Sequence, residues 1–108
     1  MKLIIAFIRP EALQKVKHEL YLKEIYSVSV TNILGAGRQK GYTELYRGVT
    51  TQVTLLKKAR LEIGVPDDKV DAVIEAITTG ARTGKEGDGV FFVLDVARAG
   101  RIRTGEAM

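Results

Sequence analysis

Residues 59–81 read ARLEIGVPDDKVDAVIEAITTGA, and this stretch predicts a strand followed directly by a helix. In its first part every second residue is apolar, which is the period of a strand with one buried face. Pro66 and the acidic pair Asp67 and Asp68 predict a helix start, where either aspartate can cap the first turn. Helical spacing of apolar residues then continues to about Ala81. The alternating residues are Ala59, Leu61, Ile63 and Val65, and the helical ones are Val70, Val73, Ile74 and Ile77.

The same order of elements precedes this stretch. Residues 1–8 are rich in large apolar side chains and predict a buried strand. Pro10 suits the first turn of a helix, and we expect that helix over residues 11–23. Residues 26–33 alternate between apolar and polar side chains, as a half-exposed strand does, and residues 90–96 predict a last strand.

This order of elements predicts an α+β fold, the ferredoxin-like βαββαβ sandwich, as one domain over residues 1–108. The two helices cover one face of an antiparallel sheet, so the other face needs a different cover. Oligomerisation is the simplest cover for a domain of this size.

Composition limits the class of protein. Of the 108 residues, 45% are apolar and 28% are charged, which is the balance of an ordinary globular domain. No cysteine is present, so disulfides and cysteine metal sites are excluded. No apolar run approaches the roughly 20 residues that cross a bilayer, and residues 1–8 are too short for a signal peptide. We therefore expect a cytoplasmic protein.

The segment of about residues 37–56 has no stable period. A hairpin between the neighbouring strands needs only about two to five residues. Longer loops in a compact domain are usually either functional or disordered, so a flexible insertion is the alternative. This loop is the first indication of function.

Catalysis finds little support in the sequence. His18 is the only histidine and lies in a predicted helix, and there is no cysteine, so nucleophilic catalysis lacks its usual residues. Residues 80–86 imitate a phosphate-binding P-loop, but three residues instead of four separate the glycines, and Glu86 replaces the hydroxyl. We expect no enzyme. A small acyl-phosphate hydrolase and a nucleic-acid-binding ferredoxin-like module stay open as alternatives. The latter needs exposed stacking aromatics, and the strands offer little beyond Tyr26.

Three segments suit an anionic ligand. Residues 83–89 hold three glycines, which let the backbone approach a ligand and form an anion nest. Arg101 and Arg103 place two guanidinium groups on one extended tail, and guanidinium forks bind phosphate. Residues 35–41 combine glycines, two cations and an amide at the root of the long loop.

Together these segments resemble the PII nitrogen-regulatory family. Residues 37–48 are similar to its T-loop, residues 81–89 to its B-loop and residues 101–106 to its C-terminal segment. The match has no gaps and covers nearly the whole chain. We use these names for about residues 37–56, 82–89 and 98–108.

The resemblance implies a homotrimer that binds ATP or ADP in the clefts between subunits. The B-loop and the T-loop root would come from one subunit, and the C-terminal arginines from its neighbour. The nucleotide-binding positions it implies are Phe7, Ser29, Gly35, Gly37, Arg38, Glu62, Gly64, Thr83, Gly87, Asp88, Gly89, Arg101 and Arg103.

The resemblance also implies a switch. Gln39 would help to bind Mg²⁺ and 2-oxoglutarate, and Lys58 would pair with a 2-oxoglutarate carboxylate. These ligands would fix the shape of the T-loop, which an ammonium transporter or another nitrogen-related protein would recognise. The partner-binding positions are Tyr42, Glu44, Tyr46 and Arg47. The alternative is a sensor of ATP and ADP alone, without a 2-oxoglutarate response, that acts on a different membrane transporter.

The sequence departs from the family at four positions. Phe7 stands where a smaller aliphatic residue is frequent. Thr51 occupies the place of the modifiable T-loop tyrosine, and Val49 that of a phosphoserine, so we expect no uridylylation or adenylylation there. Val90 replaces a basic residue that touches phosphate, which predicts weaker ATP binding or altered discrimination between ATP and ADP.

Overall fold

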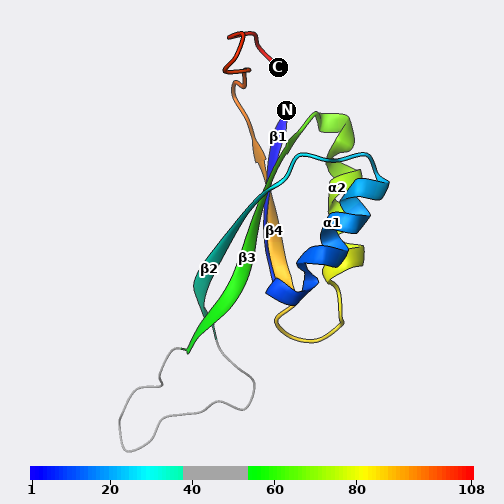
Figure 1. The fold of residues 1–108 in the computed structure, drawn as a ribbon, viewed down its shortest axis with the longest axis vertical. Coiled ribbons are helices and arrows are strands. Elements are labelled where there is room, and N and C mark those ends of the chain that lie inside the picture. Colours follow the sequence, from blue (N-terminus) through cyan, green and yellow to red (C-terminus); the bar gives the residue numbers. More distant parts are fainter. Residues whose placement is uncertain (38–53) are drawn as a thin grey trace, which may run out of the picture.

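A four-stranded antiparallel sheet carries two helices on one face (Figure 1). The computed structural model describes residues 1–37 and 54–108. The strand order is β2-β3-β1-β4, which fits the predicted ferredoxin-like α+β class. The elements are β1 (Lys2–Ile8), η1 (Pro10–Ala12), α1 (Leu13–Leu22), β2 (Ser29–Gly37), β3 (Thr54–Val65), η2 (Asp67–Lys69), α2 (Val70–Ala81) and β4 (Gly89–Asp95).

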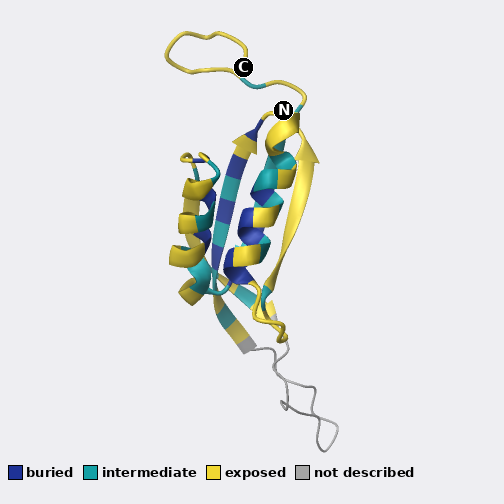
Figure 2. Ribbon diagram, turned by 90° about the vertical axis from the view of Figure 1, so that its right-hand side faces the viewer, coloured by how far each residue is buried: buried dark blue, intermediate teal, exposed yellow. Residues whose placement is uncertain are grey.

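The core lies between the helices and the two central strands. β1 alternates between buried and half-buried residues, and the predicted alternation over residues 59–65 of β3 is confirmed (Figure 2). Ala59, Leu61, Ile63 and Val65 are all buried. Val16 of α1 lies so close to Gly80 of α2 that a Cβ added at Gly80 would lie 2.6 Å from the Val16 Cα. The absence of a side chain at Gly80 therefore lets the two helices pack tightly. The buried core residues are Ile4, Ala6, Ile8, Val16, Leu20, Ile25, Ala59, Leu61, Ile63, Val65, Val73, Ala76, Ile77 and Ala81.

Strands β2 and β3 extend further toward the long loop than the sequence predicts. Their ladder continues to the pair Gly37 and Thr54, so residues 54–56 are strand, although the sequence placed them in the loop. The ladder needs only main-chain partners, so the glycines that interrupt the side-chain pattern do not interrupt the pairing. At its other end β2 begins at Ser29 rather than Tyr26, and the Tyr26 ring lies 5.3 Å from the Tyr21 ring.

The predicted caps of the second helix are wrong. The helix opens with the short turn η2, whose N-cap is Pro66, and no side chain caps it. The Asp67 carboxylate instead accepts a hydrogen bond of 2.6 Å from the Met1 amine, which lowers the pKa of Asp67. A residue 66 positions away in sequence thus takes the oxygen that was expected to cap the helix.

Helix α1 ends in a Schellman motif. The Ile25 N–H donates to the Leu20 carbonyl and the Glu24 N–H to the Tyr21 carbonyl, each at 2.9 Å. Glu24 has a φ of 62°, and it is the only non-glycine residue with positive φ in the described parts of the chain. Glycine usually occupies this position, because a Cβ is strained in the left-handed region.

We expect Glu24→Gly to stabilise the fold. Relief of the left-handed strain, about 1–2 kcal/mol, is offset in part by the greater backbone entropy that glycine loses on folding. The net gain should be about 0.5–1 kcal/mol, measured as a higher urea midpoint. Glu24→Ala serves as the control, since it removes the charge but keeps the Cβ. An equal gain in both variants would assign the effect to the charge instead.

The sheet face away from the helices is open and partly apolar. β4 is an edge strand and is exposed along its whole length (Figure 2). By the register of β1 and β4, Val90, Phe92 and Leu94 share this face with Phe7. Their exposed fractions are 53%, 53% and 42%. Such a surface is typical of a face that binds another protein surface.

Candidate functional site

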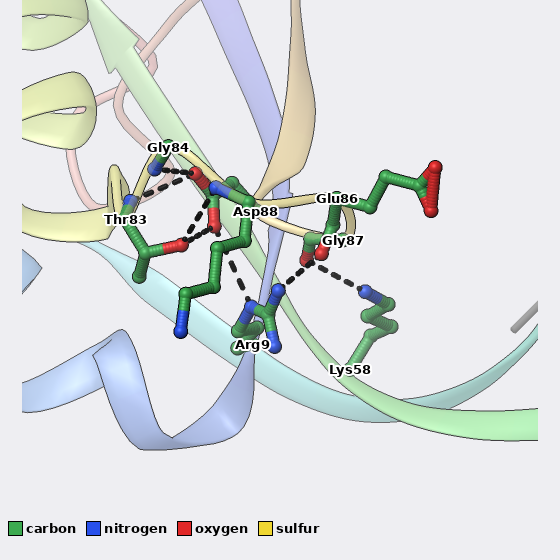
Figure 3. Close-up of polar contacts among 8 residues, drawn as sticks. Arg9, Lys58, Thr83, Gly84, Glu86, Gly87 and Asp88 are labelled. Carbon is green, nitrogen blue, oxygen red and sulfur yellow. Dashed lines mark hydrogen bonds and ion pairs between the residues drawn. The ribbon is translucent and has the colours of Figure 1, made fainter. Parts of the chain in front are cut away.

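The B-loop connects α2 to β4 and is closed by one carboxylate. Asp88 accepts hydrogen bonds from the Thr83 backbone N–H at 2.7 Å, the Thr83 hydroxyl at 2.5 Å and the Gly84 N–H at 2.9 Å (Figure 3). Gly84 and Gly87 have φ values of 87° and 92°, which L side chains rarely adopt. The predicted glycine-rich turn is therefore a defined loop, and its glycines are required by its backbone.

Two cations bind the outer carbonyls of this loop. Arg9 Nη2 donates to the Glu86 carbonyl, and Lys58 Nζ donates to the Gly87 carbonyl at 3.2 Å (Figure 3). Among the described residues, the backbone N–H groups of Gly87 and Asp88 find no acceptor. Two donors that stay available beside a cluster of cations form an arrangement suited to an anion.

The hydrogen bonds to Asp88 make its acidity a measure of loop closure. The bonds from Thr83 are the largest cause that lowers the pKa of Asp88 to about 2, and Gly84 and Arg9 add to it. Because the pKa is depressed, the stabilisation is complete above the ordinary value of 3.8 and is lost as the pH falls through about 2.

We therefore expect the Asp88 carboxyl carbon to titrate near pH 2 in a ¹³C NMR experiment. In Thr83→Val, which removes the hydroxyl donor but keeps the backbone N–H, the pKa should rise toward 3.8. The matched control is Thr79→Val, on an exposed position of α2. An Asp88 that titrates at its ordinary value in the unaltered protein would contradict the closed loop.

A basic cavity of about 770 Å³ lies beside the B-loop. Four of its lining residues are cations and two are acidic. Its positive balance suits an anionic metabolite such as a phosphate or a carboxylate. The charged lining residues are Arg9, Lys57, Lys58, Lys85, Glu11 and Glu86.

Phe7 lies on the open face at the same end of the sheet. The Arg60 guanidinium lies 5.7 Å from the centre of its ring, and Phe92 meets it edge to face at 6.4 Å. Phe7 pairs across the strands with Val90, so these two residues are direct neighbours on the open face. Gly35 also reaches this region, since a Cβ added there would lie 3.8 Å from the Lys58 Cγ.

The other predicted nucleotide residues lie toward the opposite end of the sheet. Ser29 pairs with Glu62, and Gly64 pairs with Leu3, four residues along β1 from Phe7. That spacing corresponds to about 13 Å in a strand. One chain therefore brings Phe7, Gly35, Lys58 and the B-loop together, whereas Gly64 lies away from them. Glu62 is intermediate, because it pairs with Ile5, two residues from Phe7, and lies 3.6 Å from the Arg60 guanidinium.

The C-terminal segment that carries Arg101 and Arg103 also lies away from the B-loop, at the other end of β4 (Figure 1). The segment folds back on itself, because the Gly105 N–H donates to the Arg101 carbonyl at 2.7 Å and the Arg101 N–H to the Glu106 carbonyl at 2.9 Å. Arg101 and Arg103 are exposed on this turn. Their guanidinium groups are therefore accessible to a ligand held by another surface.

Several predicted residues lie outside the described part of the chain, which omits residues 38–53. Gly37 is described only as the last residue of β2. Within residues 1–37 and 54–108, no group of three or more acidic or histidine side chains could hold a metal ion. None of the described helices is both long and apolar enough to cross a membrane. The residues outside are Arg38, Gln39, Tyr42, Glu44, Tyr46, Arg47, Val49 and Thr51.

Sequence reasoning missed Arg9 and Arg60. Arg9 contacts the B-loop across 77 positions of sequence, and only the strand register brings the two together. A cation at the end of a strand and directly before a proline is a weak local signal. Arg60 could have been found from the alternation of β3, which places it on the open face with Lys58 and Glu62.

Comparisons with known proteins point to one family over nearly the full length of the chain. The family model for nitrogen regulatory protein P-II matches residues 1–106. Nitrogen regulatory protein P-II 1 of Escherichia coli (strain K12) is 52% identical over 106 residues, which are 98% of this chain and 95% of the relative. The proteins named nitrogen regulatory protein P-II from Haemophilus influenzae and Cereibacter sphaeroides are 52% and 48% identical over the same shares.

Proposed function

This chain belongs to the nitrogen regulatory protein P-II family of signalling proteins, and from this premise we propose that it senses ATP, ADP and 2-oxoglutarate. It is a signal-transduction protein of nitrogen regulation rather than an enzyme. The observation that carries the proposal is the B-loop, which is closed by Asp88 and whose carbonyls of Glu86 and Gly87 are bound by cations. Such a loop suits the phosphates of a nucleotide.

The phosphates would be held by backbone groups of the B-loop. The Asp88 carboxylate is already engaged with Thr83 and Gly84, so its contribution to phosphate binding would come from its N–H. Phe7 offers an aromatic surface to the base. Gly35 leaves room beside Lys58 for a ligand.

The rest of the nucleotide site would come from a neighbouring subunit of a homotrimer. Gly64 lies about 13 Å along the sheet from Phe7, and Ser29 and Glu62 are displaced from Phe7 by about 7 Å in the same direction. The exposed arginines Arg101 and Arg103 lie beyond the opposite end of β4. A second copy that packs on the apolar open face could bring its own copies of these residues to the B-loop. That face would thereby gain the cover it lacks.

The basic cavity would take 2-oxoglutarate. Lys58 lines it and could exchange the Gly87 carbonyl for a carboxylate. Mg²⁺ would be held by nucleotide phosphates and the Gln39 amide oxygen, a hard ligand that suits this ion. It would neutralise phosphate charge and orient the second ligand.

The output would be the shape of the T-loop. Ligands change a loop equilibrium only through different affinities for its states, and ordering of a loop is a common switch. Tyr42, Glu44, Tyr46 and Arg47 would contact the partner, for which we propose an ammonium transporter or another nitrogen-related protein. The protein would then act in the cytoplasm, at times recruited to the membrane.

Calorimetric titration of the whole protein tests the proposal. ATP, then ADP, then 2-oxoglutarate with Mg-ATP present should each give a saturable isotherm. We expect about one ATP per chain and 2-oxoglutarate binding only after Mg-ATP. Lys58→Met should abolish the 2-oxoglutarate heat while ATP still binds.

Each outcome decides between functions. Nucleotide binding without 2-oxoglutarate would support the alternative, a sensor of ATP and ADP alone. No nucleotide binding would reject both. A salt-dependent RNA shift or rapid phosphate release would instead support the nucleic-acid or hydrolase alternative.

A further inference from the structure

Arg9 occupies a fixed position between a strand and a helix. It follows β1 directly and precedes Pro10, which restricts its backbone to extended conformations. Its carbonyl accepts a hydrogen bond of 3.0 Å from the Ala12 N–H. The backbone of Arg9 is therefore fixed by β1 on one side and by Pro10 and the Ala12 hydrogen bond on the other, so the position of its Cβ is well defined.

One guanidinium group contacts three consecutive B-loop residues. Nη2 donates to the Glu86 carbonyl, and Nε lies 3.6 Å from the Asp88 carboxylate (Figure 3). At Gly87, an added Cβ would lie 3.0 Å from Nη2, so the guanidinium packs against this glycine. The exposed fractions of the Arg9 and Asp88 side chains are 30% and 23%, so solvent only partly screens the pair.

These contacts determine where the loop donors point. In a planar trans peptide, the N–H points opposite to the carbonyl of the preceding residue. The Glu86 carbonyl faces Arg9, so the Gly87 N–H faces away from it. By the same geometry, the contact between Lys58 and the Gly87 carbonyl turns the Asp88 N–H away from Lys58.

We infer that Arg9 is a positioning residue that sets the B-loop for anion binding before any ligand arrives. It does so by holding the Glu86 carbonyl and pairing with the Asp88 carboxylate, which leaves the N–H groups of Gly87 and Asp88 available. The inference rests on the proposed nucleotide site. It extends that site to a residue that contacts the loop rather than the ligand.

The test compares Arg9→Met, Arg9→Lys and Lys15→Met in the whole protein. Lys15→Met removes one positive charge from an exposed position of α1 and is the charge control. Amide hydrogen exchange of residues 83–89 and the Asp88 pKa by ¹³C NMR are measured without nucleotide. ATP affinity is then measured by calorimetry. The midpoint of thermal unfolding shows whether each variant is still folded.

In Arg9→Met we expect faster exchange of the B-loop amides, an Asp88 pKa nearer 3.8 and ATP binding that is about tenfold weaker. The thermal midpoint should stay within a few degrees. Arg9→Lys keeps the charge and one donor, so it should recover part of each change. Lys15→Met should match the unaltered protein in every measurement.

The results separate this inference from the proposed function. Unchanged B-loop exchange and Asp88 pKa in Arg9→Met would overturn the inference, whatever happens to ATP affinity. Weaker ATP binding with an unperturbed loop would make Arg9 a direct ligand and also overturn it. If the unaltered protein binds no ATP, the proposed function fails, while exchange and pKa still decide whether Arg9 positions the loop.

Discussion

Gly89→Ala is expected to destabilise the fold by about 3–5 kcal/mol, the sum of a strained backbone and an overpacked contact. Gly89 opens β4 with a φ of 118° and pairs with Ile8. A Cβ there would lie 1.9 Å from the Phe7 carbonyl oxygen and 3.0 Å from its carbon. These atoms belong to the central strand, so they cannot move without disturbing the sheet.

Urea unfolding at one fixed protein concentration measures this effect. Gly84→Ala is the control, because Gly84 has a φ of 87° but nothing lies within 4 Å of its added Cβ. Its expected loss is the left-handed strain alone, about 1–2 kcal/mol. Equal losses in the two variants would show that the close approach to Phe7 is not what makes Gly89 necessary.

Val90→Lys is expected to raise the affinity for ATP by about ten- to a hundredfold. Val90 follows the B-loop directly, is 53% exposed and shares a face with Phe7. A lysine fits there without burial, and its ammonium would supply a charge-assisted hydrogen bond of about 1.5–3 kcal/mol to phosphate. The gain should be greater for ATP than for ADP, since ATP carries more charge.

Calorimetry with both nucleotides tests this expectation, with Val90→Met as the control for side-chain length. The methionine variant should show little of the gain, because it adds length without charge. If Val90→Lys leaves both affinities unchanged while the unaltered protein binds ATP, then position 90 does not reach the phosphates. In that case the missing basic residue has no consequence for nucleotide binding.

The sequence predicted those features that depend on local pattern. The alternation of Ala59 to Val65 placed the C-terminal part of β3 correctly, and the helical spacing from Val70 to Ala81 placed α2 correctly. Side-chain period determines which residues face a core, and it survives in a single sequence. The glycine-rich turn of residues 83–89 was also predicted from local sequence, because glycines let the backbone turn. Gly84, Gly87 and Gly89 do have positive φ values.

What the sequence did not reveal depends on pairing between distant segments. The ladder between β2 and β3 continues to Gly37 and Thr54 because main-chain groups pair whatever the side chains are. Asp67 was expected at a helix cap, but it binds the Met1 amine 66 positions away. The role of Arg9 was not predicted, because its contact with Glu86 spans 77 positions. The sequence therefore indicated the chemistry of the site residues but not which distant residues they contact.

The exposed edge strand β4 has a consequence for the solubility of a single chain. β4 reads GVFFVLD, which is rich in residues that favour strands, has one charge and contains no proline. A segment of this kind at an open edge is a template for pairing with identical copies and for growth into cross-β fibrils. A chain whose β4 edge is uncovered is therefore at risk of aggregation. If the proposed homotrimer covers this strand, variants that weaken the trimer are expected to appear first as insoluble protein.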